Sequence, residues 1–209
     1  MATIFLDLDG TLVDPKLGIH AAFTYALTTM GLPVPEDLDW IIGPSLVDSF
    51  NQLGAPDPGE GLRLYRKRYT DTGMYAAHVY AGIPKVLRDL KAAGHILHLA
   101  TAKPHAYATK ITAHFDLAGF LEHQFGPELD GTRNDKGELL AYALDRLGEE
   151  VANCVMVGDR HHDYNAARAV GMASVAVTWG YGNADERTLA DVICEAPKGL
   201  VRAVTQALK

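Results

Sequence analysis

The stretch IFLDLDGTLVD, residues 4–14, is the starting point for predicting the fold. It begins as an apolar run, which is typical of a buried strand, and then places aspartates at positions 7 and 9. Residues two apart in a strand point to the same side, so Asp7 and Asp9 can face one site where the strand ends. Two carboxylates in one apolar place repel each other and lose hydration, so a positive partner is expected beside them.

The composition of the 209-residue chain is that of an ordinary globular protein, 48% hydrophobic and 22% charged, long enough for one domain with a modest insertion. The formal net charge of −7 provides no overall basic field, so neither a nucleic-acid polymer nor an anionic membrane is an expected partner. No apolar run approaches the roughly 20 residues of a membrane span, and no signal peptide is expected. Cys154 and Cys194 are expected to be buried free thiols in a cytoplasmic protein.

Apolar runs and helical patterns alternate along most of the chain. Strands are predicted at 2–8, 95–102, 151–159 and 173–180, with weaker candidates at 122–126 and 191–194. Helices are predicted from Pro84 to Gly94, from Pro104 to Asp116, and over 136–148, 162–170 and 197–208. This alternation predicts an α/β fold, a Rossmann-like parallel sheet with helices on both faces and a ligand site at the carboxyl ends of the strands.

Residues 15–80 interrupt this alternation, because they contain helical patterns and no convincing strand. The segment begins just after the first strand and ends at the turn-forming AGIP, residues 81–84. We therefore expect a catalytic core made of residues 1–14 and 81–209, with residues 15–80 inserted as a small helical cap over the strand ends.

Polar residues follow three of the predicted strands. Thr101, Ala102 and Lys103 follow one, a loop leading to Arg133 and Lys136 follows the next, and Asp159 and Asp163 follow a third. In a parallel sheet these ends meet at the edge that carries Asp7 and Asp9. Clustered carboxylates without a thiolate favour a hard divalent cation, and Mg²⁺ suits them best. A magnesium ion with a lysine and a threonine also makes a phosphate site.

Four motifs in order give the chain a resemblance to the haloacid dehalogenase (HAD) superfamily. DLDGT (7–11), followed by Asp14, resembles the first motif, and LATAKP (99–104) resembles the second. The lysine of NDKGELL (134–140) resembles the third, and VGDRHHD (157–163) resembles the fourth. The helical insertion resembles the C1 cap of phosphoglycolate phosphatase-like and nucleotidase-like members.

The resemblance implies a role for each motif residue. Asp7 would be the nucleophile that forms an aspartyl-phosphate, and Asp9 would be the general acid and base. Thr101 would bind a phosphoryl oxygen, and Lys136 would neutralise charge on Asp7 and the phosphoryl group. The implied metal ligands are Asp7, Asp9 through its backbone carbonyl, Asp159 and Asp163. The residues assigned to substrate binding are Gly10, Thr11, Ala102, Gly43 and Arg133. Dehalogenases of the superfamily lack the second aspartate of the first motif, so the presence of Asp9 implies a phosphatase.

Several positions carry alternative interpretations. Arg133 is an alternative to Lys136 as the basic residue of the third motif, and Asp135 is a possible partner that would weaken the charge of Lys136. Lys103 suits a solvated position better than a substrate contact. His161 and His162 suit a contact with substrate or loop better than metal ligation. The basic run YRKRY, residues 65–69, is either an exposed helix face or a contact for an anionic leaving group.

These features predict a Mg²⁺-dependent phosphatase that acts on a small phosphomonoester. Phosphoglycolate is the first substrate expected, and a nucleoside 5′-monophosphate follows closely. The alternatives are a β-phosphoglucomutase-like phosphotransferase, a phosphonate hydrolase that would use a cap lysine such as Lys16 or Lys67, and a non-catalytic regulatory binding protein. The sequence is compatible with a monomer or a homodimer.

Overall fold

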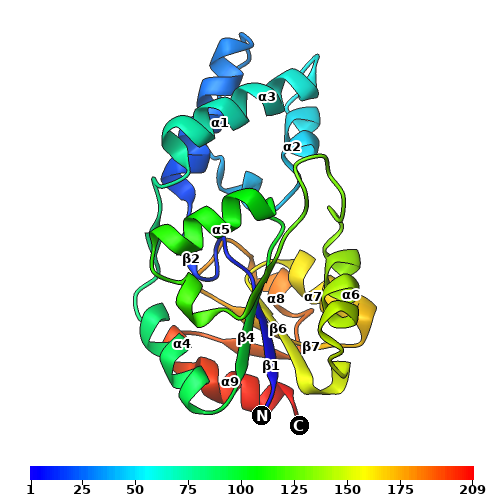
Figure 1. Cartoon of the computed structure of the whole chain (residues 1–209). Helices are drawn as coiled ribbons and strands as arrows, with labels where there is room; N and C mark the ends of the chain where they lie inside the picture. Colours follow the sequence, from blue (N-terminus) through cyan, green and yellow to red (C-terminus); the bar gives the residue numbers. More distant parts are fainter. The chain divides into compact units, whose positions relative to one another are not determined.

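Figure 1 shows the computed structural model of the chain, which describes all residues from 1 to 209. The chain forms two compact units. The first consists of Met1–Val13 together with Val79–Lys209, and the second consists of Asp14–His78. The second unit is therefore an insertion into the first. Two short strands, β2 (Val13–Asp14) and β3 (His78–Val79), pair where the chain leaves the first unit and returns to it.

A six-stranded sheet with the order β5-β4-β1-β6-β7-β8 forms the centre of the first unit. All neighbouring strands are parallel, and β1 lies between β4 and β6, with Leu6 in register with Leu99 and Val157. This confirms the predicted α/β fold class, and the two weaker strand candidates form the outer strands. The strands are β1 (Thr3–Leu6), β4 (Ile96–Ala100), β5 (His123–Phe125), β6 (Cys154–Gly158), β7 (Ala173–Val177) and β8 (Val192–Cys194).

Helices cover the sheet as the crossover connections require. They are α4 (Ile83–Ala92), α5 (His105–His114), α6 (Lys136–Leu147), α7 (His161–Val170), α8 (Ala184–Arg187) and α9 (Leu200–Ala207). The pair α6 and α7 packs together and contacts β4, β6 and β7, whereas α4 packs with α9 (Figure 1). The β1-to-β4 and β5-to-β6 connections run in opposite directions along the sheet, so right-handed crossovers place α4 and α6 on opposite faces. No helix combines the length and apolar composition needed to cross a bilayer.

Some element boundaries differ from the predictions for local reasons. The predicted strand at 151–159 begins only at Cys154, because Val151–Asn153 form a 3-10 turn. The predicted helix at 197–208 is likewise divided into a 3-10 turn, Pro197–Gly199, and α9. A further 3-10 turn, Ala118–Phe120, follows α5.

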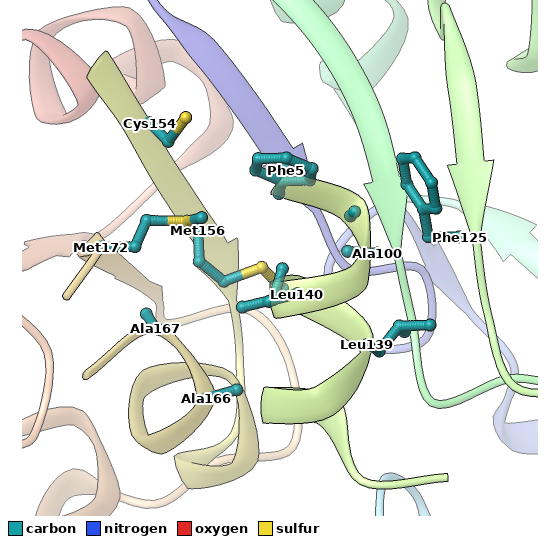
Figure 2. Packing of buried hydrophobic residues seen from close by; sticks show 11 residues of the cluster. Phe5, Ala100, Phe125, Leu139, Leu140, Cys154, Met156, Ala166, Ala167 and Met172 are labelled. Carbon is teal, nitrogen blue, oxygen red and sulfur yellow. The ribbon is translucent and has the colours of Figure 1, made fainter. Parts of the chain in front are cut away.

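The core between the sheet and α6 and α7 is apolar and closely packed. Figure 2 shows Phe5 of β1 and Met156 of β6 facing Leu140 of α6, with the small residues Ala166 and Ala167 on α7. The two alanines let α7 lie close to α6 and β6. Each fully buried large side chain contributes about 1.5–3 kcal/mol to folding, so this layer holds the strand ends in place. Cys154 belongs to the same core, and both it and Cys194 are buried free thiols, as expected.

The inserted unit is helical. It contains α1 (Lys16–Thr29), a 3-10 turn (Asp39–Ile41), α2 (Leu46–Gln52), α3 (Pro58–Arg68) and a π-helical turn (Tyr69–Gly73). Its core is aromatic: the rings of Phe23 and Phe50 stack at 4.3 Å, and those of Tyr65 and Tyr69 at 5.4 Å. The run YRKRY is therefore only partly an exposed face, because its two tyrosines are buried while Lys67 and Arg68 are exposed.

Candidate active site

The carboxyl end of β1 carries Asp7 in a fixed backbone position. The Asp7 amide donates to the carbonyl of Val157 at 2.9 Å, which ties the residue to β6. The chain then turns: the amides of Leu12 and Val13 both donate to the carbonyl of Leu8, at 2.9 and 3.0 Å. Gly10 has a φ of +82°, a conformation that side chains with a Cβ rarely adopt. This turn is how DLDGT presents its aspartates at the sheet edge.

Lys136, the first residue of α6, reaches Asp7 from across the sheet. Its Nζ donates to Asp7 Oδ1 at 2.8 Å and also to Asp163 Oδ1, and the lysine is buried. Burial lowers the pKa of Lys136, but the charges of Asp163 and Asp7 more than offset this, so its pKa is above the ordinary value. Lys136 is therefore a permanent cation at the centre of the cluster.

The other candidates of the third-motif loop are bound elsewhere. Arg133 pairs with Glu128 at 2.6 Å, and its guanidinium lies 4.5 Å from the ring centre of Tyr142. Asp135 does not pair with Lys136 but caps α6, where its carboxylate accepts the Glu138 amide at 2.9 Å. The structure therefore favours Lys136 over Arg133 as the basic residue beside Asp7.

Three buried aspartates form an acidic cluster around Lys136. Carboxylate oxygens of Asp7, Asp159 and Asp163 all lie within 4.8 Å of one another. Asp159 Oδ2 accepts the Tyr181 amide at 2.7 Å, whereas Asp159 Oδ1 is buried without a hydrogen-bond partner. Burial and the charges of Asp163 and Asp7 raise the pKa of Asp159 well above its usual range. Burial, offset in part by Lys136, raises the pKa of Asp163 to about 6.

The acidic cluster fits a divalent cation. When all three carboxylates are ionised, one ammonium group leaves an excess of two negative charges, and the unpartnered Asp159 Oδ1 is a buried acceptor without a donor. Hard oxygen ligands of this kind suit Mg²⁺. Glycines make room for the carboxylates: a Cβ on Gly10 would lie 2.1 Å from Asp159 Oδ2, and one on Gly180 would lie 2.4 Å from the same oxygen.

Asp9 stands apart from the three clustered carboxylates and has its own partner. Its Oδ2 lies 2.6 Å from Lys103 Nζ, and the two side chains are only 13% and 8% exposed, while Oδ1 has no hydrogen-bond partner. Burial raises the pKa of Asp9, and Lys103 offsets part of the rise. The prediction of a solvated Lys103 is therefore wrong. The only clue in the sequence was its place, two residues after Thr101 at a strand end.

The remaining predicted site residues differ in burial and in hydrogen bonding. Thr101 is buried, and its hydroxyl accepts the Lys103 amide at 3.2 Å; it does not cap α5, which begins only at His105. Thr11 Oγ1 is buried without a hydrogen-bond partner, whereas Ala102 is exposed. Gly43 belongs to the inserted unit, where it has a φ of +108°. Its contact with substrate stays a prediction.

One of the paired histidines, His161, contacts a carboxylate outside the acidic cluster. His161 Nδ1 lies 2.8 Å from Glu186 Oε2, and the rings of His161 and His162 lie 3.9 Å apart. Burial and the neighbouring His161 lower the pKa of His162 to about 4, so its ring is neutral near pH 7. Glu186 was not singled out in the sequence, because its position 23 residues beyond Asp163 belongs to no motif.

A model of the haloacid dehalogenase-like hydrolases matches residues 4–177. The chain belongs to this family. The match spans the acidic cluster, Lys136 and the inserted unit, so it confirms the resemblance that the four motifs indicated.

Proteins similar to this HAD-family chain carry several names. A 5′-nucleotidase of Pseudomonas aeruginosa is 40% identical over 188 residues, which cover 88% of this chain and 85% of the relative. The tyrosine-protein kinase PtkA of Mycobacterium tuberculosis is 38% identical over 198 residues, covering 92% of this chain and 68% of PtkA. A crystal structure of a predicted phosphatase from Clostridium acetobutylicum has a TM-score of 0.93 at 31% identity and covers 98% of both chains.

Proposed function

We propose that the chain is a Mg²⁺-dependent phosphatase that hydrolyses a small phosphomonoester through an aspartyl-phosphate on Asp7. The observation that carries the proposal is the buried arrangement of Lys136 between Asp7 and Asp163, with Asp159 beside them. Family membership and the similarity to proteins named 5′-nucleotidase and phosphatase support it.

Asp7 is the nucleophile in this proposal. One of its oxygens is held by Lys136, which orients the carboxylate. A carboxylate oxygen of Asp7 forms a bond to phosphorus as the bond from phosphorus to the alcohol oxygen breaks. Water then attacks phosphorus, releases inorganic phosphate and regenerates Asp7. Lys136 stabilises the negative charge that develops on the phosphoryl oxygens.

Asp9 transfers the protons. Its raised pKa suits a carboxylic acid that gives a proton to the leaving alcohol and then takes one from the attacking water. Lys103 holds Oδ2, so Oδ1 is the oxygen left to exchange the proton. Thr101 and the backbone amides of the Gly10–Thr11 turn would bind phosphoryl oxygens.

Asp7, Asp159 and Asp163 would hold the magnesium ion, with the backbone carbonyl of Asp9 as a further ligand. When bound, the ion neutralises these carboxylates and draws charge from the phosphoryl oxygens. Without it, the excess negative charge of the cluster would repel a phosphate ester.

A nucleoside 5′-monophosphate is the substrate class that the 40% identical relative favours. Phosphoglycolate, the first expectation from the sequence, stays the second candidate. The similarity to a relative named phosphoglycolate phosphatase, 31% identical over 221 residues, supports it. In this reading Gly43 and Arg66 act on substrate choice.

The test is phosphate release from a panel of nucleoside monophosphates, phosphoglycolate, sugar phosphates and an aryl phosphate, with Mg²⁺ and no acceptor. Asp7→Asn keeps the shape of the side chain and removes the nucleophile, and Asp145→Asn changes an exposed aspartate on α6 as the matched control. We expect turnover by the wild type and the control, none by Asp7→Asn, and loss of activity in EDTA. Full activity of Asp7→Asn would overturn the mechanism. If the wild type releases no phosphate without an acceptor but transfers it once a sugar acceptor is added in a second run, the phosphotransferase is favoured.

A further inference from the structure

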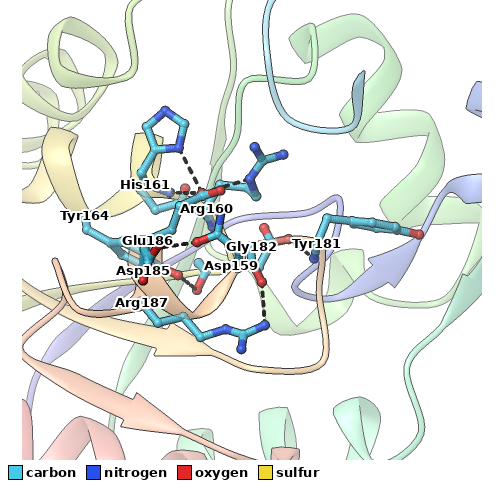
Figure 3. Close-up of polar contacts among 12 residues, drawn as sticks. Asp159, Arg160, His161, Tyr164, Tyr181, Gly182, Asp185, Glu186 and Arg187 are labelled. Carbon is cyan, nitrogen blue, oxygen red and sulfur yellow. Dashed lines mark hydrogen bonds and ion pairs between the residues drawn. The ribbon is translucent and has the colours of Figure 1, made fainter. Parts of the chain in front are cut away.

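Glu186 lies outside every motif, yet it contacts the segment that joins two aspartates of the acidic cluster. Its Oε2 accepts three hydrogen-bond contacts: from Arg160 Nε at 3.0 Å, from the His161 amide at 2.9 Å and from His161 Nδ1 at 2.8 Å (Figure 3). Arg160 and His161 are two of the three residues between Asp159 and Asp163. One carboxylate of α8 therefore fixes the backbone and the side chains of the turn from β6 into α7.

The same turn positions Asp163. The Arg160 amide donates to Asp163 Oδ2 at 3.0 Å, and the Asp163 amide donates to the Arg160 carbonyl at 3.0 Å. Asp163 is thereby oriented by the residue whose guanidinium Glu186 holds. A displaced Arg160 would move the carboxylate that also binds Lys136.

Asp159 is positioned by the loop that leads to Glu186. Residues 178–183 join β7 to α8, and within them the Tyr181 amide donates to Asp159 Oδ2 at 2.7 Å (Figure 3). The loop lies against Asp159 so closely that a Cβ on Gly182 would lie 1.9 Å from the Asp159 carbonyl oxygen. Arg187, next to Glu186, closes the loop by donating to the carbonyls of Gly182 and Thr178.

We propose that Glu186 is a positioning residue that holds Asp159 and Asp163 in place for binding of the cation. The inference rests on the proposed function, because it assumes that the acidic cluster binds Mg²⁺. Glu186 acts on both aspartates. Through Arg160 and His161 it holds the turn from β6 into α7, and as part of α8 it lies at the end of the loop that carries the Tyr181 amide. Glu186 is well suited to this task because it stays ionised. Burial raises its pKa, but the His161 amide, Arg160 and the His161 ring outweigh this and lower the pKa to about 2.

The test is the Kd of Mg²⁺, measured by isothermal titration calorimetry on the full chain, together with the melting temperature without metal. We expect Glu186→Ala to weaken Mg²⁺ binding by about 10–100-fold, the usual effect of losing a partner that orients metal ligands. Glu186→Gln keeps an oxygen for the His161 amide and loses the charge, so a smaller loss is expected. Glu195→Gln, a change at an exposed glutamate after β8, should leave the Kd unchanged.

Each result separates a positioning role from a structural one. A lower melting temperature with an unchanged Mg²⁺ Kd in both Glu186 variants would overturn the proposal. If Glu186→Ala fails to fold, Glu186→Gln decides, and a Kd equal to that of the wild type would overturn it. A wild type that binds no Mg²⁺ would overturn the proposed metal dependence and this inference together, whereas binding by the wild type and equally by the variants would overturn this inference alone.

Discussion

Lys136 Nζ lies 2.8 Å from Asp7 Oδ1, although 129 positions separate the two residues in the sequence. The same ammonium group bonds to Asp163, so one buried cation joins the end of β1 to the start of α7. The arrangement serves the fold and the chemistry at once, because each carboxylate would otherwise be a buried charge without a counter-charge.

Replacing Lys136 tests its contribution to folding and its contribution to catalysis. Lys136→Met keeps the length of the side chain and removes the charge, so Asp7 and Asp163 lose their shared donor. We expect turnover to fall by about 10²–10³, as when a donor to a developing oxyanion is removed. We also expect the free energy of unfolding without metal to fall by about 3–5 kcal/mol, the usual cost of leaving a buried charge unpaired.

The measurements are steady-state phosphate release and urea unfolding, with Lys110→Met as the control. Lys110 is an exposed lysine on α5, so its replacement should change neither quantity. Turnover of Lys136→Met at the wild-type level would show that the contact is not needed for catalysis.

The glycine of DLDGT is expected to be required for metal binding. In Gly10→Ala the new methyl group would lie 2.1 Å from Asp159 Oδ2, in a backbone with φ +82°. Gly94→Ala has nearly the same φ, +83°, with no atom within 4 Å of the new methyl group. Backbone strain of about 1 kcal/mol is common to both variants, so the difference between them isolates the clash with Asp159. We expect only Gly10→Ala to lose Mg²⁺ binding, and equal Mg²⁺ Kd values for the two would contradict this.

The sequence was sufficient to predict the fold because the informative patterns are local. Apolar runs such as Thr3–Leu6 and Cys154–Gly158 can only be buried, and their parallel pairing follows from the helices between them. The aspartates at the strand ends then meet at one edge, which is why the sequence predicts Asp7, Asp9, Asp159 and Asp163 together there. Three of them form the acidic cluster, whereas Asp9 pairs with Lys103.

The contacts that the sequence did not reveal depend on side-chain direction. Lys103 and Glu186 are charged residues on loops or short helices, where the usual expectation is solvation. Both are bound inside the molecule, Lys103 to Asp9 and Glu186 to Arg160, because tertiary packing turns them inward. No periodicity in the sequence predicts that these side chains point inward. The reverse holds for Arg133, whose sequence position beside the third motif suggested the site while its guanidinium lies over Tyr142.

The effect of Mg²⁺ on stability should depend on pH. Asp163 has a pKa of about 6 in the folded protein against 3.8 ordinarily, and the pKa of Asp159 is also raised. A raised pKa means that the folded protein holds these protons more tightly than the unfolded chain. For Asp163 this contribution to stability is therefore complete below about pH 4 and is lost as the pH rises through about 6, and the raised pKa of Asp159 acts in the same direction. For Asp163 alone the difference is about 3 kcal/mol.

Because Mg²⁺ binds the ionised carboxylates, it should restore stability only above this range. We expect the rise in melting temperature on adding Mg²⁺ to be small near pH 5 and large near pH 7.5, and Asp163→Asn to reduce the difference. Asp145→Asn serves as the control. The same rise at both pH values would argue against ionisation of the cluster as the condition for binding.

Lys103 should set the pH range in which Asp9 works. The pKa of Asp9 is raised by burial, lowered in part by Lys103, raised by Asp7 and lowered by Lys136. Removing the ammonium group in Lys103→Met takes away the largest effect that lowers this pKa, so the pKa of Asp9 should rise further. The limb of the pH–rate profile that reports ionisation of Asp9 should then move to higher pH. Lys103→Arg keeps the charge and should leave the limb close to its wild-type position.

The measurement is kcat/KM from about pH 4 to about pH 9 with saturating Mg²⁺. A profile that keeps its shape in Lys103→Met, while its height falls, would show that Lys103 supports the turnover without tuning Asp9.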